Sequence, residues 1–179
     1  METNATSSIT TTSVGVRYGL LLTVSGILVD FLVRIAGFNF MTFGIASFLG
    51  GTTVSIVWIV LAHAAFKRAN SNLMTFGQGL TIAMIMMLIA GIISGLFSYL
   101  YVHYIDPEFV ERMKAGMTEF MERNNVPDEQ IETSIARLDG MNMGIGKALL
   151  GGLGNGIGLG LVLGLIVSAF TKRNPPEFE

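Results

Sequence analysis

Residues 149–170 read LLGGLGNGIGLGLVLGLIVSAF, a stretch without a charged side chain that is long enough to decide the fold. A membrane-spanning helix needs about 20 mostly apolar residues. Within this stretch glycine recurs at every fourth position, so one face of a helix would carry a line of very small residues. Such a line lets two membrane helices approach closely. We therefore predict a spanning helix with a helix-packing face at Gly152, Gly156, Gly160 and Gly164.

Glycine-rich segments also bind phosphate groups in nucleotide-binding proteins, and this alternative fails on context. A dinucleotide-binding loop needs a strand before it and a helix that begins on it. No strand pattern precedes residue 149, and the segment contains no Gly-Lys-Ser or Gly-Lys-Thr sequence. The partner of the glycine face stays open, because it could be another span of the same chain or a second copy.

The composition of the whole chain agrees with a membrane protein. Of the 179 residues, 51% are hydrophobic and 13% are charged, and the mean hydropathy is +0.60. A soluble domain has about 25% charged residues. The net charge of −2 argues against a nucleic-acid partner, since no basic surface would neutralise phosphates. The chain has no cysteine, and we expect no cofactor and no metal ion.

Four apolar blocks predict an all-α bundle of four transmembrane helices that forms a single membrane domain over residues 16–173. The flanks would be a disordered polar N-terminus, residues 1–15, and a C-terminal tail, residues 174–179. The resemblance of each block to a spanning helix rests on its length and its lack of charge. The predicted spans cover residues 16–38, 44–66, 76–105 and 148–170.

Charged residues predict the orientation of the bundle. Lysine and arginine are enriched on the cytoplasmic flanks of spans, and basic residues flank the predicted N- and C-terminal ends of the domain and the loop between the second and third spans. The loop at residues 106–144 instead carries nine acidic and four basic residues. We therefore expect both termini in the cytoplasm and this loop outside.

The outer loop is predicted to form two amphipathic helices, the first of them capped by Asp106. Apolar residues recur there at helical spacing, and the stripe includes Phe109, Met113, Met117 and Phe120. Methionine-rich stripes adapt to many shapes. This face could pack on the bundle or could bind a partner, and both alternatives stay open.

Polar residues inside the spans are the remaining candidates for a site. Asp30 and Arg34 lie one helical turn apart near the end of the first span and could form an ion pair, while Asn155 lies within the last span. Ionisable residues in spans often mark function. No catalytic set of side chains accompanies them, so we predict that the protein is not an enzyme.

The order of motifs resembles the bacterial family known as domain of unknown function 4199. The likeness rests on RYGL at 17–20, KRAN at 67–70 with MTFGQGL at 74–80, YLYVHYIDPEFVERM at 99–113, and LIVSAFTKR at 165–173. The resemblance implies a four-helix protein of the bacterial inner membrane. The family has no assigned activity, so it implies no catalytic residues.

Two functional hypotheses follow from the sequence. The first is a non-enzymatic membrane component that acts through helix packing and contacts with other proteins. The alternative is a small oligomeric transporter or channel. In either case the bilayer is the expected environment, and a second copy or another membrane protein is a possible partner.

Overall fold

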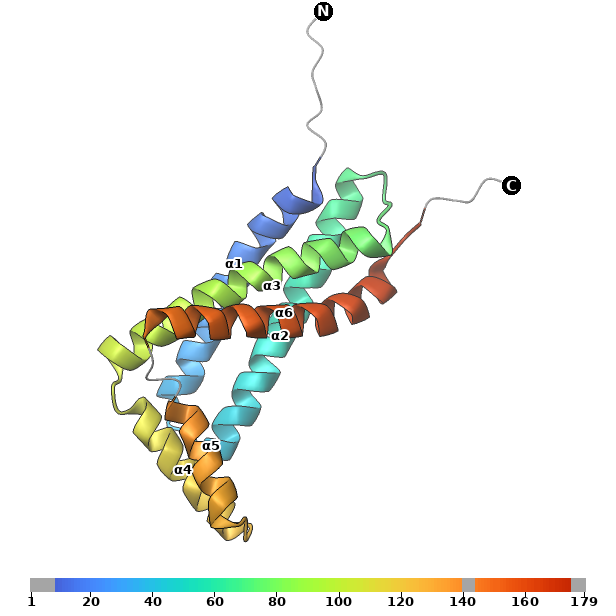
Figure 1. Cartoon of the computed structure of the whole chain (residues 1–179). Helices are drawn as coiled ribbons and strands as arrows, with labels where there is room; N and C mark the ends of the chain where they lie inside the picture. Colours follow the sequence, from blue (N-terminus) through green and yellow to red (C-terminus); the bar gives the residue numbers. More distant parts are fainter. Residues whose placement is uncertain (1–8, 140–143, 175–179) are drawn as a thin grey trace, which may run out of the picture.

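The computed structural model describes residues 9–139 and 144–174, and all the regular elements longer than a single bridge in these ranges are helices (Figure 1). They are α1 (Thr11–Ile35), α2 (Phe40–Ala69), α3 (Phe76–Leu100), the π-helical turn η1 (Tyr101–Ile105), α4 (Phe109–Arg123), α5 (Asp128–Asp139) and α6 (Ile145–Thr171).

Four helical segments in the described part of the chain are long and apolar enough to cross a membrane: α1, α2, α6 and the continuous segment of α3 and η1. Large apolar side chains such as Leu28, Phe48 and Leu150 are exposed on their outer surfaces. An exposed apolar surface of this extent is typical of a protein that contacts lipid or another protein, and the length of the helices fits the bilayer. The prediction of an all-α bundle with four spans is confirmed.

The first helix begins earlier than the sequence predicted. The side chain of Thr10 accepts a hydrogen bond from the backbone N–H of Ser13 and so caps the helix. Val14 and Gly15 are buried against the bundle. The prediction that residues 11–15 belong to a disordered terminus is therefore wrong, while residues 1–8 and 175–179 lie outside the described residues.

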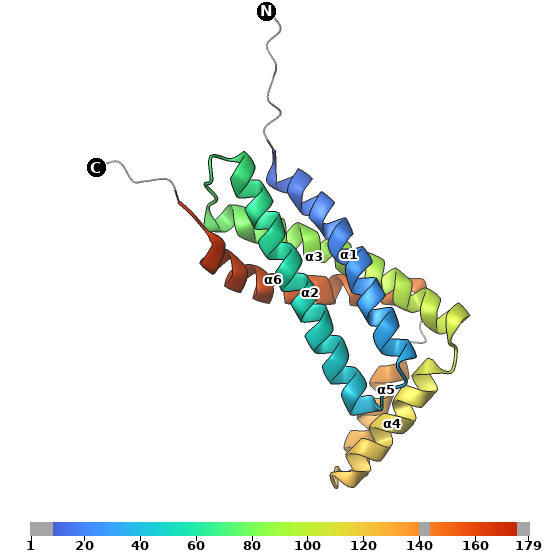
Figure 2. The same ribbon diagram turned by 180° about the vertical axis from the view of Figure 1, so that it is seen from behind.

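Glycines determine how the spans pair. α6 lies along α3, and α1 contacts α3 on another side (Figures 1 and 2). A β-carbon on Gly19 of α1 would lie 3.0 Å from the Cα of Met86 in α3. Such close backbone approach is typical of membrane helices that pack through small residues.

One end of the bundle is held together by polar contacts, and we call it the closed end. His63 of α2 is fully buried there, with Nδ1 2.7 Å from the hydroxyl of Thr171 and Nε2 2.9 Å from the carbonyl oxygen of Gly79. Met74 and Arg173 exchange two backbone hydrogen bonds of 2.9 and 2.8 Å. These contacts join α2, α3 and α6.

The opposite end carries the α4–α5 hairpin, and we call it the hairpin end. Phe109 of α4 packs edge-on against Phe43 of α2, with 5.5 Å between ring centroids, and against Tyr101, at 5.6 Å. α1 begins and α6 ends at the closed end (Figures 1 and 2). This arrangement agrees with an even number of spans.

Candidate functional site

A cavity of about 460 Å³ lies between α1, α2, α3 and α6 in the half of the bundle nearer the hairpin. It exists because α2 and α6, which are bonded to each other at the closed end, draw apart toward the hairpin end (Figures 1 and 2). Residues of all four membrane helices line it. We call it the membrane cavity.

Two kinds of glycine line the membrane cavity. The first kind holds α3 and α6 together: a β-carbon on Gly152 would collide with the carbonyl oxygen of Gly91, and one on Gly156 would lie 2.5 Å from that of Met87. The second kind leaves space. A β-carbon on any of Gly26 of α1, Gly51 of α2 or Gly151 of α6 would meet no atom within 4 Å.

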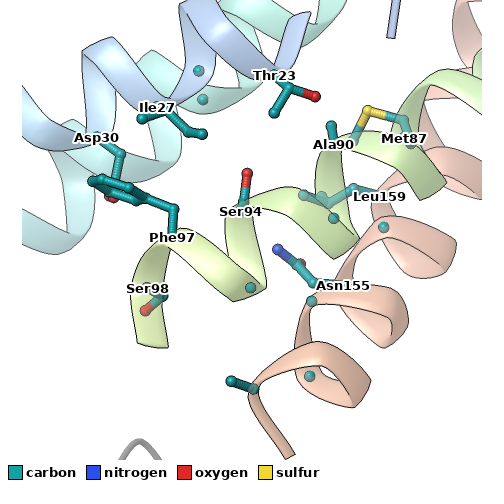
Figure 3. Close-up of a pocket in the computed structure, with 18 of the residues that line it drawn as sticks. Thr23, Ile27, Asp30, Met87, Ala90, Ser94, Phe97, Ser98, Asn155 and Leu159 are labelled. Atoms are coloured by element: carbon teal, nitrogen blue, oxygen red, sulfur yellow. The ribbon is translucent and has the colours of Figure 1, made fainter. Parts of the chain in front are cut away.

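Polar groups are spaced around the cavity. Ser94 of α3 and Asn155 of α6 point toward its middle, and Thr23 faces it from α1 (Figure 3). Ser47 of α2 also lines it, and its hydroxyl oxygen is buried without a hydrogen-bond partner among the described residues. The remaining lining includes apolar side chains such as Leu159. The cavity therefore offers both hydrogen bonds and apolar contact.

The strongest polar feature is the pair of Asp30 and Arg34. Nε of Arg34 donates a hydrogen bond of 2.7 Å to Oδ2 of Asp30. The Arg34 side chain is only 7% exposed, and its guanidinium carbon lies 4.6 Å from the ring centres of both Tyr101 and Phe109. Such cation–π contacts compensate part of the cost of removing the cation from water.

One buried donor of this guanidinium, Nη1 of Arg34, has no hydrogen-bond partner among the described residues. Native proteins rarely leave a buried donor unpaired, because the group loses its bonds to water and gains none. This atom marks a place where a bound molecule would supply an acceptor.

A second hollow, of about 920 Å³, lies between the start of α2 and α4, and we call it the hairpin groove. Arg34 lines both hollows. In the groove Asp106 accepts a hydrogen bond of 3.0 Å from Nη1 of Arg112. This bond holds the pKa of the Asp106 carboxyl below its usual range, and the carboxylate raises the pKa of Arg112.

The structure brings some of the candidate residues together. Asp30, Arg34 and Asn155, from two different helices, line one cavity. Gly152 and Gly156 line it as well, whereas Gly160 and Gly164 face α3 nearer the closed end, where their β-carbons would lie 3.0 Å from Met87 and 2.9 Å from Leu80.

The apolar stripe of α4 faces the bundle. Phe109 is buried, Met113 packs against the aromatic cluster around it, and the ring of Phe120 lies 6.3 Å from that of Phe40 in α2. Met117 is partly buried. The start of α2 thus covers part of the stripe, whereas Phe120 stays exposed.

Sequence reasoning missed the three glycines that leave space, Gly26, Gly51 and Gly151. Nothing in the local sequence separates Gly151 from Gly152, because the difference depends on which helix lies opposite. Ser47 and Ser94 gave a weak signal, since each is a polar residue inside an apolar span.

Comparison with known protein families gives one match. The family described as "Protein of unknown function (DUF4199)" matches residues 17–173, which include nearly all of the four membrane helices and the hairpin. The chain belongs to this family. No curated protein and no solved structure matches the chain. DUF4199 has no assigned function.

Proposed function

We propose that the protein is a non-enzymatic component of the bacterial inner membrane that binds a small amphipathic molecule in the membrane cavity. One observation carries the proposal. Gly26, Gly51 and Gly151, on three different helices, leave open space at the same place in the bundle. A side chain at any of them would reduce the cavity.

The size and the lining of the cavity support a binding site. Ligand pockets have volumes of about 300–1,000 Å³ and combine an apolar lining with a few polar groups, and the membrane cavity has about 460 Å³. Leu22, Ile27 and Phe97 supply apolar contact, while Ser94 and Asn155 supply hydrogen bonds. An amphipathic molecule matches this combination.

Contacts with other proteins would use the face of α6 that points away from α3, rather than the glycine line or the Phe109 stripe that the sequence suggested. α3 covers the line from Gly152 to Gly164, and α2 covers the Phe109 stripe except for the exposed Phe120. A second copy or another membrane protein would therefore bind the opposite face of α6, where Gly154 and Gly158 are exposed.

The test introduces a large side chain at one glycine that lines the cavity and, as a matched control, at one glycine that does not. Gly151→Leu would place a side chain in the cavity, whereas Gly158→Leu adds the same side chain to an open position of the same helix that does not line it. Each protein is extracted from its native membrane in mild detergent, and its intact mass is measured with bound molecules retained.

We expect the unchanged protein and Gly158→Leu to retain a bound small molecule and Gly151→Leu to lose it. Equal retention by all three, or no bound molecule in the unchanged protein, would contradict the proposal.

A small transporter is the second candidate, and one observation favours it. Arg34 borders both the membrane cavity and the hairpin groove, so a rearrangement of this side chain would join the two hollows. A ligand-binding component and a transporter differ in reconstituted vesicles, because only the transporter moves the bound molecule across the bilayer.

A further inference from the structure

We propose that the molecule in the membrane cavity is an anionic lipid whose charged headgroup accepts a hydrogen bond from Nη1 of Arg34. This inference rests on the proposed function and names the class of its ligand. It is carried by the unpaired donor of Arg34, the mixed polar and apolar lining of the cavity and the position of the cavity between membrane-spanning helices.

The surroundings of Arg34 leave one buried donor for a further bond. Asp30 occupies Nε, and the rings of Tyr101 and Phe109 lie 4.6 Å from the guanidinium carbon. Nη1 is the buried nitrogen that no described residue satisfies. A phosphate or carboxylate oxygen is the preferred partner of a guanidinium, because the bond is charge-assisted and matches the planar donor geometry.

The charged residues that line the cavity are Asp30, Arg34 and Lys147. Asp30 is the acid among them, and its carboxylate already accepts the bond from Nε of Arg34, which leaves the buried Nη1 for an anionic group. In the hairpin groove, which Arg34 also lines, the other charges are paired among themselves: Arg112 with Asp106, and Arg123 with Glu119. No acid other than Asp30 is bonded to Arg34 in the described part of the chain.

The position of the cavity favours a lipid over a soluble anion. The cavity lies between membrane-spanning helices, and Gly151 and Asn155, which line it, are exposed. A molecule entering between α2 and α6 would come from the bilayer. Its apolar chain would cover Leu22, Ile27 and Leu159, which inorganic phosphate would leave uncovered.

The experiment measures lipid binding to the purified full-length protein by intact mass in mild detergent. The probes are dioleoyl phosphatidylglycerol, which is anionic, dioleoyl phosphatidylethanolamine, which is zwitterionic, and inorganic phosphate as a competitor. The variant is Arg34→Gln, and the matched control is Arg17→Gln, an exposed arginine at the other end of α1.

We expect one molecule of phosphatidylglycerol to bind about tenfold or more tightly than phosphatidylethanolamine, the ratio expected for one charge-assisted hydrogen bond. Arg34→Gln should abolish this preference, and Arg17→Gln should keep it. Arg34→Lys keeps the charge and the ion pair with Asp30 but removes the second donor nitrogen, so it should also lose the preference. This variant gives the answer if Arg34→Gln does not fold.

Separate results would overturn the inference and the proposed function. If Gly151→Leu blocks phosphatidylglycerol binding but Arg34→Lys binds it normally, the cavity is a lipid site without the assigned headgroup contact, and the inference is wrong. If millimolar phosphate displaces the lipid completely, the ligand is a soluble anion and the inference is also wrong. If Gly151→Leu binds lipid normally, the proposed function itself fails.

Discussion

Gly156 and Gly158 lie two positions apart in α6, and a methyl group added to each would meet different surroundings. At Gly156 the new carbon would lie 2.5 Å from the carbonyl oxygen of Met87, which belongs to the backbone of α3 and cannot turn away. At Gly158 it would meet no atom within 4 Å. The same residue type therefore has two roles, one of close contact and one of no contact.

This difference predicts that Gly156→Ala destabilises the bundle and Gly158→Ala does not. Forcing α3 and α6 apart should cost about 1–3 kcal/mol, as overpacking does in other tightly packed interiors. The free energy of unfolding, measured by titration with a denaturing detergent, gives the comparison. Equal stability of the two variants would show that α3 and α6 do not meet at Gly156.

Charged contacts help to position the α4–α5 hairpin. Asp106 follows η1 and binds Arg112 of α4, with one hydrogen bond of 3.0 Å, and the hydroxyl of Tyr101 donates to the same carboxylate at 3.3 Å. The Asp106 carboxylate thus fixes the angle at which the chain leaves α3 and enters α4.

Stability should depend on pH through this carboxylate. The hydrogen bond from Arg112 lowers the pKa of Asp106 in the folded protein. A lowered pKa means that the carboxylate stabilises the fold above its ordinary pKa of about 4 and that this contribution is lost as the pH falls through the lowered value. We expect Asp106→Asn to melt at a lower temperature than the unchanged protein at pH 7.

The melting temperatures of the two proteins should converge as the pH falls from about 4 through the lowered pKa of Asp106, where the unchanged carboxyl also takes up its proton. Trp58, the single tryptophan of the chain, reports melting through its fluorescence. A difference that stays constant as the pH falls through this range would contradict the ionic role of Asp106.

The elements could be predicted from sequence where a repeated pattern defines them. The spans follow from apolar length, and α4 and α5 from apolar residues at helical spacing. Single polar residues were harder to interpret. Thr10 was assigned to a disordered tail although it caps α1, and Asp106 was predicted to cap α4 but instead binds Arg112.

The site could be predicted only in part, for a physical reason. Asp30, Arg34 and Asn155 are conspicuous because polar side chains are costly in an apolar span. That they share a cavity depends on the angle at which α2 and α6 diverge, which is a property of all four helices together. Open space beside Gly51 has no signature in the chain, since glycine also serves close packing.

At the scale of the whole molecule, the closed end and the hairpin end should lie on opposite sides of the membrane. The chain has no cysteine, so a single introduced cysteine reports one position without background. Ala69 ends α2 at the closed end and Gln130 lies in α5, and both are exposed.

In cells treated with a membrane-impermeant maleimide, we expect Gln130→Cys to be labelled and Ala69→Cys to be labelled only after the inner membrane is permeabilised. This result would support cytoplasmic termini. The reverse pattern would show that the basic flanks do not determine the orientation, and labelling of both positions in intact cells would contradict the four-span arrangement.

The polar contacts of the closed end also determine how late in synthesis the bundle can complete its packing. His63 and Thr171 are 108 positions apart, so a ribosome that adds about 5–20 residues per second needs about 5–20 s to supply the partner of this histidine. During that interval α2 and α3 have left the ribosome while the backbone groups beside Gly91 lack their partner helix. A message cut before α6 would yield a chain in which His63 keeps Gly79 as the partner of Nε2 but lacks Thr171 as the partner of Nδ1, so that one ring nitrogen is left unsatisfied among apolar neighbours.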